Sequence, residues 1–173
     1  MDLLLQELLG VNFQTALSFF HQGLREVTGK RSSDQMVYVA SVLAHFSLTS
    51  RNSNDRPPFA NLGEVFDNFV FKNEVSKDPE VLEIAGSQVI LFAGFFRHQM
   101  MKRHIVSWYD DLGRSFYLKA SLNTPSQKKK DLFKSMSYSL PFWNLSCNKL
   151  HKKCREDKYL IQYIHFGKAV KRD

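Results

Sequence analysis

The spacing of apolar side chains is the feature that most constrains the fold of this chain. Large apolar residues recur every three or four positions, for example at Phe13, Leu17, Phe20 and Leu24, which is the period of one face of an α-helix. We find no sustained alternation with period two, the pattern of a half-buried strand. The spacing therefore predicts an all-α fold, a compact bundle of six to eight helices with a basic helical segment at the C-terminal end.

The composition is typical of one folded domain. Of the 173 residues, 43% are hydrophobic and 24% are charged, as in ordinary globular proteins. The fifteen phenylalanines supply enough volume for a single hydrophobic core at this chain length. We predict a helical core domain over residues 1–125 and a basic, aromatic-rich helical segment over residues 126–173 that packs on it as part of the same domain.

Capping residues and prolines place the expected helices. Asn12 is a helix-capping residue, Asp78 followed by Pro79 is a strong start signal, and Ser126 can cap a basic helix. Proline has no backbone N–H, so Pro141 is expected to interrupt that last helix, with one or two more helices over residues 142–173. The other predicted helices cover residues 12–27, 34–49, 60–75, 80–101 and 104–122.

The positive charge of the chain is concentrated in its last quarter. The whole chain carries a formal charge of +7, whereas residues 126–173 hold twelve basic and four acidic side chains. Such a segment attracts phosphates or acidic proteins. We therefore predict a non-catalytic binding or regulatory protein with an acidic or nucleic-acid partner, contacted through Lys128, Lys129, Lys130, Lys134, Lys152 and Lys153. An equally open alternative is that these lysines form a solvated face, and the shortage of arginine favours weak, salt-dependent binding.

The segment of residues 92–117 supports a second hypothesis. It mixes aromatic, basic and acidic side chains, which is typical of a polar cleft. A small-ligand protein or an enzyme would have its pocket between the helices of residues 80–101 and 104–122, lined by Arg97, Arg103, Tyr109, Asp110 and Arg114. Whether the chain is an enzyme stays open, because it contains none of the common catalytic motifs.

The same segment also has a purely structural interpretation. In that case Arg114 pairs with Asp110 one helical turn earlier, and Gly94 and Gly113 allow close contact between helices. The large apolar side chains of the segment then belong to the core: Phe92, Phe95, Phe96, Trp108, Tyr109, Leu112 and Phe116.

Cys147, His151 and Cys154 form the pattern closest to a metal site. On a helix, their spacings of four and three residues place them on one face, where His165 could complete a zinc site. Closed zinc sites use cysteines two to four residues apart, and these two are seven apart. We therefore expect no metal and no cofactor, and interpret Cys147, Leu150 and Cys154 as part of an apolar stripe with His151 at its edge.

The cysteine content and the length of the apolar runs indicate the cellular location of the protein. Two cysteines are too few for a disulfide-stapled secreted fold, and the acidic start differs from a signal peptide. The most apolar run, residues 84–96, is shorter than a membrane span. We expect a cytoplasmic protein without membrane insertion, and the many phenylalanines leave a homo-oligomer open.

The segment around residues 91–117 also carries a family resemblance. Its pattern combines a glycine within an apolar run with later arginines and tyrosines. The residues are Leu91, Phe92, Ala93, Gly94, Phe95, Phe96, Arg103, Tyr109, Leu112, Gly113, Arg114 and Tyr117. Over about residues 35–120 this pattern resembles an uncharacterised group of bacterial helical proteins. The resemblance implies a bacterial, cytosolic, all-helical protein, supplies no reaction, and does not include the basic segment.

Overall fold

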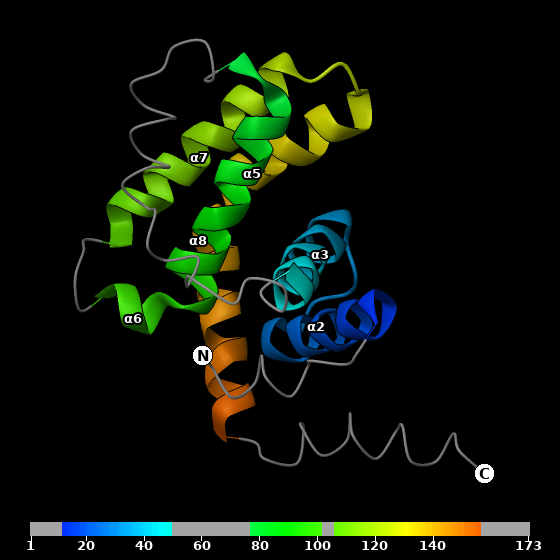
Figure 1. Cartoon of the computed structure of the whole chain (residues 1–173), viewed down its shortest axis with the longest axis vertical. Coiled ribbons are helices and arrows are strands. Elements are labelled where there is room, and N and C mark those ends of the chain that lie inside the picture. Colours follow the sequence, from blue (N-terminus) through cyan, green and yellow to red (C-terminus); the bar gives the residue numbers. More distant parts are fainter. Residues whose placement is uncertain (1–11, 50–76, 102–105, 157–173) are drawn as a thin grey trace.

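Every regular element of the described part of the chain is a helix (Figure 1). The computed structural model describes residues 12–49, 77–101 and 106–156. The all-α prediction is confirmed for these residues, whereas the predicted helix of residues 60–75 and everything after residue 156 lie outside them. The elements are α2 (Phe13–Thr28), α3 (Asp34–Thr49), α5 (Pro79–Val89), the π-helix η4 (Ile90–Phe95), α6 (Arg97–Met101), α7 (Val106–Asn123) and α8 (Gln127–Glu156).

The predicted capping residues begin the helices as expected. The Asn12 side-chain oxygen accepts the Thr15 N–H at 2.9 Å, and Asp78 caps α5 with Pro79 in its first turn. Ser126 accepts the Lys129 N–H at 3.4 Å in the same way. Side-chain oxygens at these positions satisfy N–H groups that have no partner within the helix. Local sequence therefore determines where α2, α5 and α8 begin.

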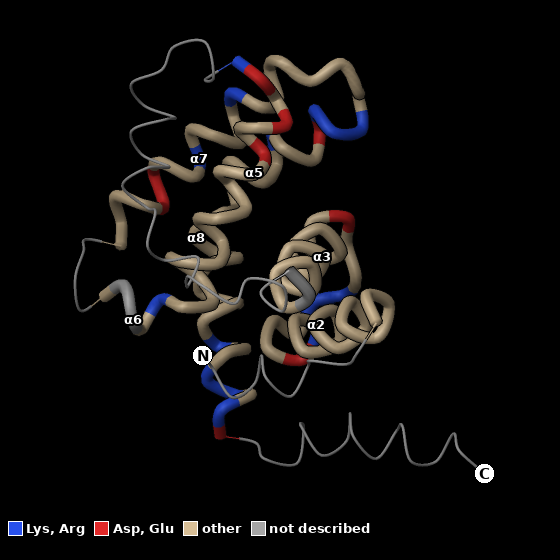
Figure 2. Tube along the Cα trace, in the orientation of Figure 1, with Lys and Arg blue, Asp and Glu red and all other residues tan. Residues whose placement is uncertain are grey.

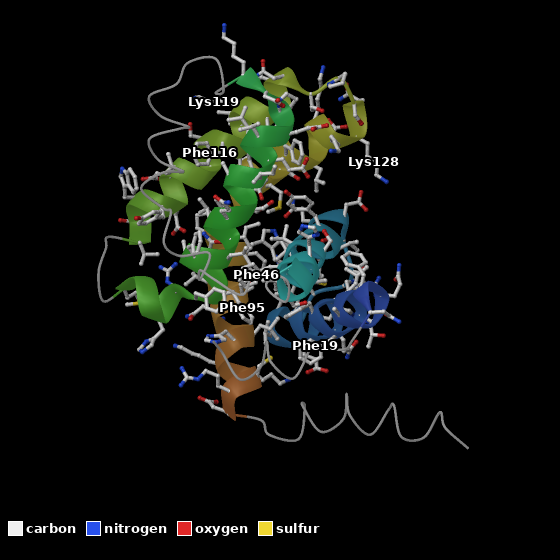
Figure 3. All side chains as sticks on the ribbon, viewed as in Figure 1. Phe19, Phe46, Phe95, Phe116, Lys119 and Lys128 are labelled. Carbon is white, nitrogen blue, oxygen red and sulfur yellow. The ribbon has the colours of Figure 1, made fainter. Side chains whose placement is uncertain are left out.

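Helix α8 is the longest element and organises the others around it. It lies along α7 and also contacts η4, α2 and α3, while α5 packs on α7 and α2 packs on α3 (Figure 1). The core contains side chains from all the longer helices and from η4, among them Phe46 and Phe95 (Figure 3). No described helix is long and apolar enough to cross a membrane. The division at residue 125 stays a prediction.

The expected interruption at Pro141 is wrong, because α8 continues through it. A proline within a helix leaves the carbonyl four residues earlier without its N–H donor, and here that carbonyl belongs to Ser137. Arg114 of α7 donates its Nε–H to the Ser137 carbonyl oxygen at 3.0 Å. A side chain from the neighbouring helix thus replaces the missing backbone donor.

The predicted helix of residues 80–101 is also not continuous. It changes from α5 into η4 and turns at Phe96 before α6 begins. The Phe96 N–H donates to the Leu91 carbonyl at 2.8 Å, the five-residue spacing of a π-helix. At Gly94, an added Cβ would lie 3.1 Å from the Asn144 Cα, so the η4 backbone lies directly against α8.

Most of the predicted aromatic core is confirmed, with one exception. Trp108 is 44% exposed, because it lies on the side of α7 away from the core, whereas Leu112 is partly buried. The close contact expected at Gly113 is confirmed, since a Cβ there would lie 2.6 Å from a methyl carbon of Leu140. The buried members of the predicted set are Phe92, Phe95, Phe96, Tyr109 and Phe116.

Candidate functional site

Two residues of the predicted ligand pocket contact each other. Arg97 of α6 lies 3.9 Å from an Asp110 carboxylate oxygen of α7, and their side chains are only 18% and 14% exposed. The Arg97 guanidinium also donates to the Ala93 carbonyl oxygen at 3.0 Å. A carboxylate and a carbonyl oxygen therefore already engage this arginine within the protein.

Asn144 of α8 extends the same cluster inward. It is fully buried, and its amide N–H donates to the second Asp110 oxygen at 2.6 Å. The side-chain amide oxygen of Asn144, Oδ1, has no hydrogen-bond partner. It lies 3.1 Å from the position that a Gly94 Cβ would occupy. An unpaired buried acceptor is a local destabilisation. Asp110 therefore links α6, α7 and α8.

Arg114 does not join this cluster. The expected pair between Arg114 and Asp110 is wrong, because Arg114 lies 3.8 Å from Asp111 instead. Its Nε–H donates to the Ser137 carbonyl oxygen of α8. Tyr109 is buried, and burial raises its pKa. Arg103 lies outside the described residues. Arg97 and Arg114, the two described arginines of the predicted pocket, thus have separate carboxylate neighbours and separate carbonyl acceptors.

The cations of α8 lie in two groups at opposite ends of the helix (Figure 2). The span of residues 135–148 between them carries no charged side chain. At 1.5 Å per residue, the separation of 15 positions between Lys134 and Lys149 corresponds to about 22 Å. The first group is Lys128, Lys129, Lys130 and Lys134, and the second is Lys149, Lys152, Lys153 and Arg155.

Only two of these eight cations pair with a described carboxylate. Lys129 lies 3.1 Å from Glu83 of α5. Lys153 pairs with Glu26 of α2 and, by its hydrogen bond, lowers the pKa of that carboxyl group. Lys128 lies at the edge of the molecule (Figure 3). The cations of α8 without a described carboxylate partner are Lys128, Lys130, Lys134, Lys149, Lys152 and Arg155.

The predicted cysteine–histidine stripe lies inside the core. Cys147, His151 and Cys154 are all buried on α8, and the His151 ring lies 4.7 Å from that of Phe95. Burial raises the pKa of Cys147 to about 12, so its thiol is neutral at pH 7. Among the described residues no group of three metal-ligating side chains is close enough to hold an ion.

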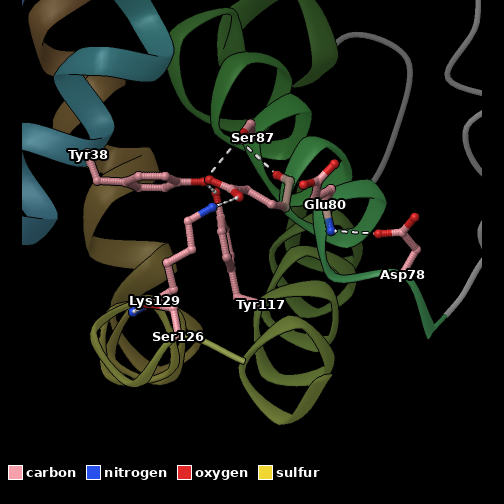
Figure 4. Close-up of polar contacts among 8 residues, drawn as sticks. Tyr38, Asp78, Glu80, Ser87, Tyr117, Ser126 and Lys129 are labelled. Carbon is pink, nitrogen blue, oxygen red and sulfur yellow. Dashed lines mark hydrogen bonds and ion pairs between the residues drawn. The ribbon is translucent and has the colours of Figure 1, made fainter. Parts of the chain in front are cut away.

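Sequence patterns did not reveal a cluster of hydroxyl groups between α3, α5 and α7 (Figure 4). Ser87 donates to the Glu83 carbonyl oxygen at 2.9 Å. The Tyr38 hydroxyl lies 3.1 Å from that of Ser87 and 3.2 Å from that of Tyr117. Burial raises the pKa of both tyrosines. These residues are far apart along the chain, so no local spacing could indicate the cluster.

The outward face of α8 is a second feature that sequence reasoning missed. Tyr138 and Leu145 are 67% and 49% exposed and lie seven residues apart, which is two helical turns. The expected break at Pro141 would place them on separate helices. A continuous helix places them on one face, between the two groups of cations.

Comparison of the chain with family models, curated proteins and solved structures finds no match. The resemblance to a group of bacterial helical proteins therefore stays a prediction, and the functional argument depends on the geometry alone.

Proposed function

We propose that this chain is a non-catalytic binding protein that holds an acidic partner through the lysines of α8. The observation that carries the proposal is the set of six α8 cations that have no carboxylate partner among the described residues. A surface with excess charge of one sign attracts partners of the opposite sign. A cytoplasmic location and self-association stay predictions.

The first turn of α8 supports this proposal. Lys128 and Lys130 lie there, the first turn holds no acidic residue, and neither lysine pairs with the following Asp131, although the N-terminus of a helix already carries partial positive charge. Cations at this position destabilise the helix slightly, and an acidic partner would offset that cost. Of the three lysines in this turn, only Lys129 has a described carboxylate partner, Glu83.

The alternative of a small-ligand protein or enzyme receives less support from the geometry. An arginine that binds an anionic ligand needs free donors directed at it, whereas Arg97 and Arg114 already have acceptors within the protein. No observation on the described residues favours a reaction at this cluster.

A titration with matched charge variants tests the proposal. A fluorescein-labelled glutamate-rich peptide is titrated with the protein at 50 and 200 mM salt, with anisotropy as the readout. One variant replaces Lys128, Lys130, Lys134 and Lys152 by glutamine. Its control removes the same number of charges away from α8, with Arg25, Arg31, Lys77 and Lys119 replaced by glutamine.

We expect binding at the lower salt concentration that weakens at the higher one. Loss of four contacting charges should lower affinity by about tenfold or more, because each contact contributes to the salt-dependent term. The control should retain most of the affinity. Absence of binding at 50 mM salt, or an equal loss in both variants, would show that the lysines of α8 do not form the site.

A further inference from the structure

The outward face of α8 combines charge and apolar surface in a fixed order. Lys134, Tyr138, Leu145, Lys149 and Lys152 are all exposed and follow one another at spacings of four, seven, four and three residues. Such spacings place side chains on one face of a helix. We name these five residues the α8 stripe.

The centre of the α8 stripe is free of charge, and its two ends are basic. Phe142 lies beside the centre, but Lys30 covers its ring, with the ammonium group 4.0 Å from the ring centroid. Tyr138 and Leu145 therefore form the exposed apolar centre. From Lys134 to Lys152 the stripe is about 27 Å long, at 1.5 Å per residue.

From this arrangement we propose that the partner of α8 is an acidic amphipathic helix that docks along the α8 stripe. This inference depends on the proposed function and specifies its partner. Apolar side chains on the middle turns of the partner helix would cover Tyr138 and Leu145, and carboxylates near its two ends would face the lysines. Helices that pack in this way bury apolar surface at the centre and leave charges at the rim.

The charge pattern favours such a helix over a nucleic acid. A nucleic acid carries phosphates along its whole length, whereas residues 135–148 offer phosphates no cation of α8, and Lys30 over Phe142 is a cation from outside α8 beside them. A leucine also gives no stacking surface for a base. A protein helix, in contrast, can match a neutral centre and two basic ends with its own sequence.

Asp131 and Glu156 limit the surface at its ends. Both are exposed and lie about one turn beyond the terminal lysines of the α8 stripe. A longer acidic partner would meet like charges there, which weakens association. Asp131 separates the α8 stripe from Lys128 and Lys130, so the segment of the partner that faces the stripe has about five turns, or 18 residues, and Lys128 and Lys130 would contact acidic residues outside that segment.

The test uses two labelled peptides and two charge-neutral double variants of the full chain. The first peptide is an amphipathic helix with leucines on its central turns and glutamates at both ends. The second contains the same residues in scrambled order, without an apolar face. One variant is Tyr138→Ser with Leu145→Ser, and its control on α7 is Leu118→Ser with Leu122→Ser, two positions that are 43% and 73% exposed.

We expect the first peptide to bind the wild-type protein, and the α8 double variant to bind it at least about tenfold more weakly. The α7 control should bind as the wild type does. The scrambled peptide should bind weakly and equally to all three proteins, because only the charges attract it. Circular dichroism confirms that each variant folds.

The remaining outcomes separate the two proposals. Failure of both peptides to bind at 50 mM salt overturns the proposed function and this inference with it. Equal binding of both peptides to the wild type and the α8 double variant overturns the inference alone. A single-stranded oligonucleotide that binds more tightly than the first peptide and loses affinity in Tyr138→Ser identifies a nucleic acid as the partner and rejects the helix.

Discussion

At the residue scale, Arg114 shows how one side chain can allow a proline in the interior of a helix. Pro141 removes the donor for the Ser137 carbonyl, and the Arg114 guanidinium supplies another from α7. Ser137 is buried, so water does not readily replace that donor. The arginine that the sequence suggested for a ligand pocket thus has a structural role in the fold.

This role predicts a coupling between Arg114 and Pro141. Arg114→Met should lower the free energy of unfolding by about 1–2 kcal/mol, because the buried carbonyl loses its donor. In a Pro141→Ala background the alanine N–H can bond Ser137, so the same substitution should cost less than half as much. Urea unfolding followed by circular dichroism measures all four proteins of this double-mutant cycle.

Asp111→Asn is the control for the exposed ion pair of Arg114, and it should change stability by less than about 0.5 kcal/mol. Equal costs of Arg114→Met with and without Pro141 would show that the arginine stabilises the protein in some other way.

At the element scale, the charges of α8 interact unfavourably with the helix dipole at the N-terminal end and favourably at the C-terminal end. Lysines occupy its first turn, where positive charge is unfavourable, and Lys153 and Arg155 occupy its last turn, where positive charge is favourable. The unfavourable N-terminal lysines are among the residues that we assign to partner binding. Stability and binding are therefore expected to oppose each other at this end.

Charge reversal at the two ends of α8 should have opposite effects on stability. Lys128→Glu should raise the free energy of unfolding by about 0.3–1 kcal/mol and weaken binding of the acidic peptide. Arg155→Glu, the matched reversal in the last turn, should lower the free energy of unfolding. Thermal unfolding at low salt measures both, and the same sign of change for the two variants would contradict the dipole argument.

The η4 segment shows that apolar spacing does not predict where an α-helix changes into a π-helix. The apolar spacing of residues 84–96 is compatible with an α-helix, and the start at Asp78 was predicted from local signals. Within the π-helix, the Gly94 backbone lies against Asn144 of α8. That contact joins residues fifty positions apart, so local spacing carries no sign of it.

At the scale of the whole molecule, the hydroxyl cluster joins α3, α5 and α7 in the core. Tyr117 is fully buried, and the Gly86 backbone lies close to its ring: an added Cβ would be 2.7 Å from two ring carbons. Ionised phenols are strongly disfavoured in such surroundings. The stability of the whole fold is therefore linked to proton binding at alkaline pH.

We predict that the contribution of the two buried tyrosines to stability is lost above about pH 10, the ordinary tyrosine pKa. Burial raises the pKa of Tyr38 and Tyr117 in the folded state. The stability that protonated tyrosines contribute is complete below the unfolded pKa and is lost as pH rises towards the folded pKa. Urea unfolding at pH 8 and pH 11 measures this loss, and absorbance at 295 nm reports tyrosine ionisation.

Three variants identify the groups responsible for the alkaline loss. Tyr38→Phe and Tyr117→Phe should each remove one late-ionising tyrosine from the absorbance titration. Cys147→Ala should reduce the loss that begins near pH 9, since burial raises the pKa of this thiol to about 12. Early ionisation of all tyrosines in the folded protein would contradict the burial of the cluster.

The sequence alone determined the helical class of the described residues and the starts of α2, α5 and α8, because period and capping depend on residues within one or two turns of each other. The packing of distant helices decided the rest. Arg114 can compensate for Pro141 only because α7 packs beside α8. Asp110 pairs with Arg97 rather than with Arg114 only because α6 contacts α7. The continuity of α8, which brings Tyr138 and Leu145 onto one face, therefore follows from contacts between residues distant in the sequence.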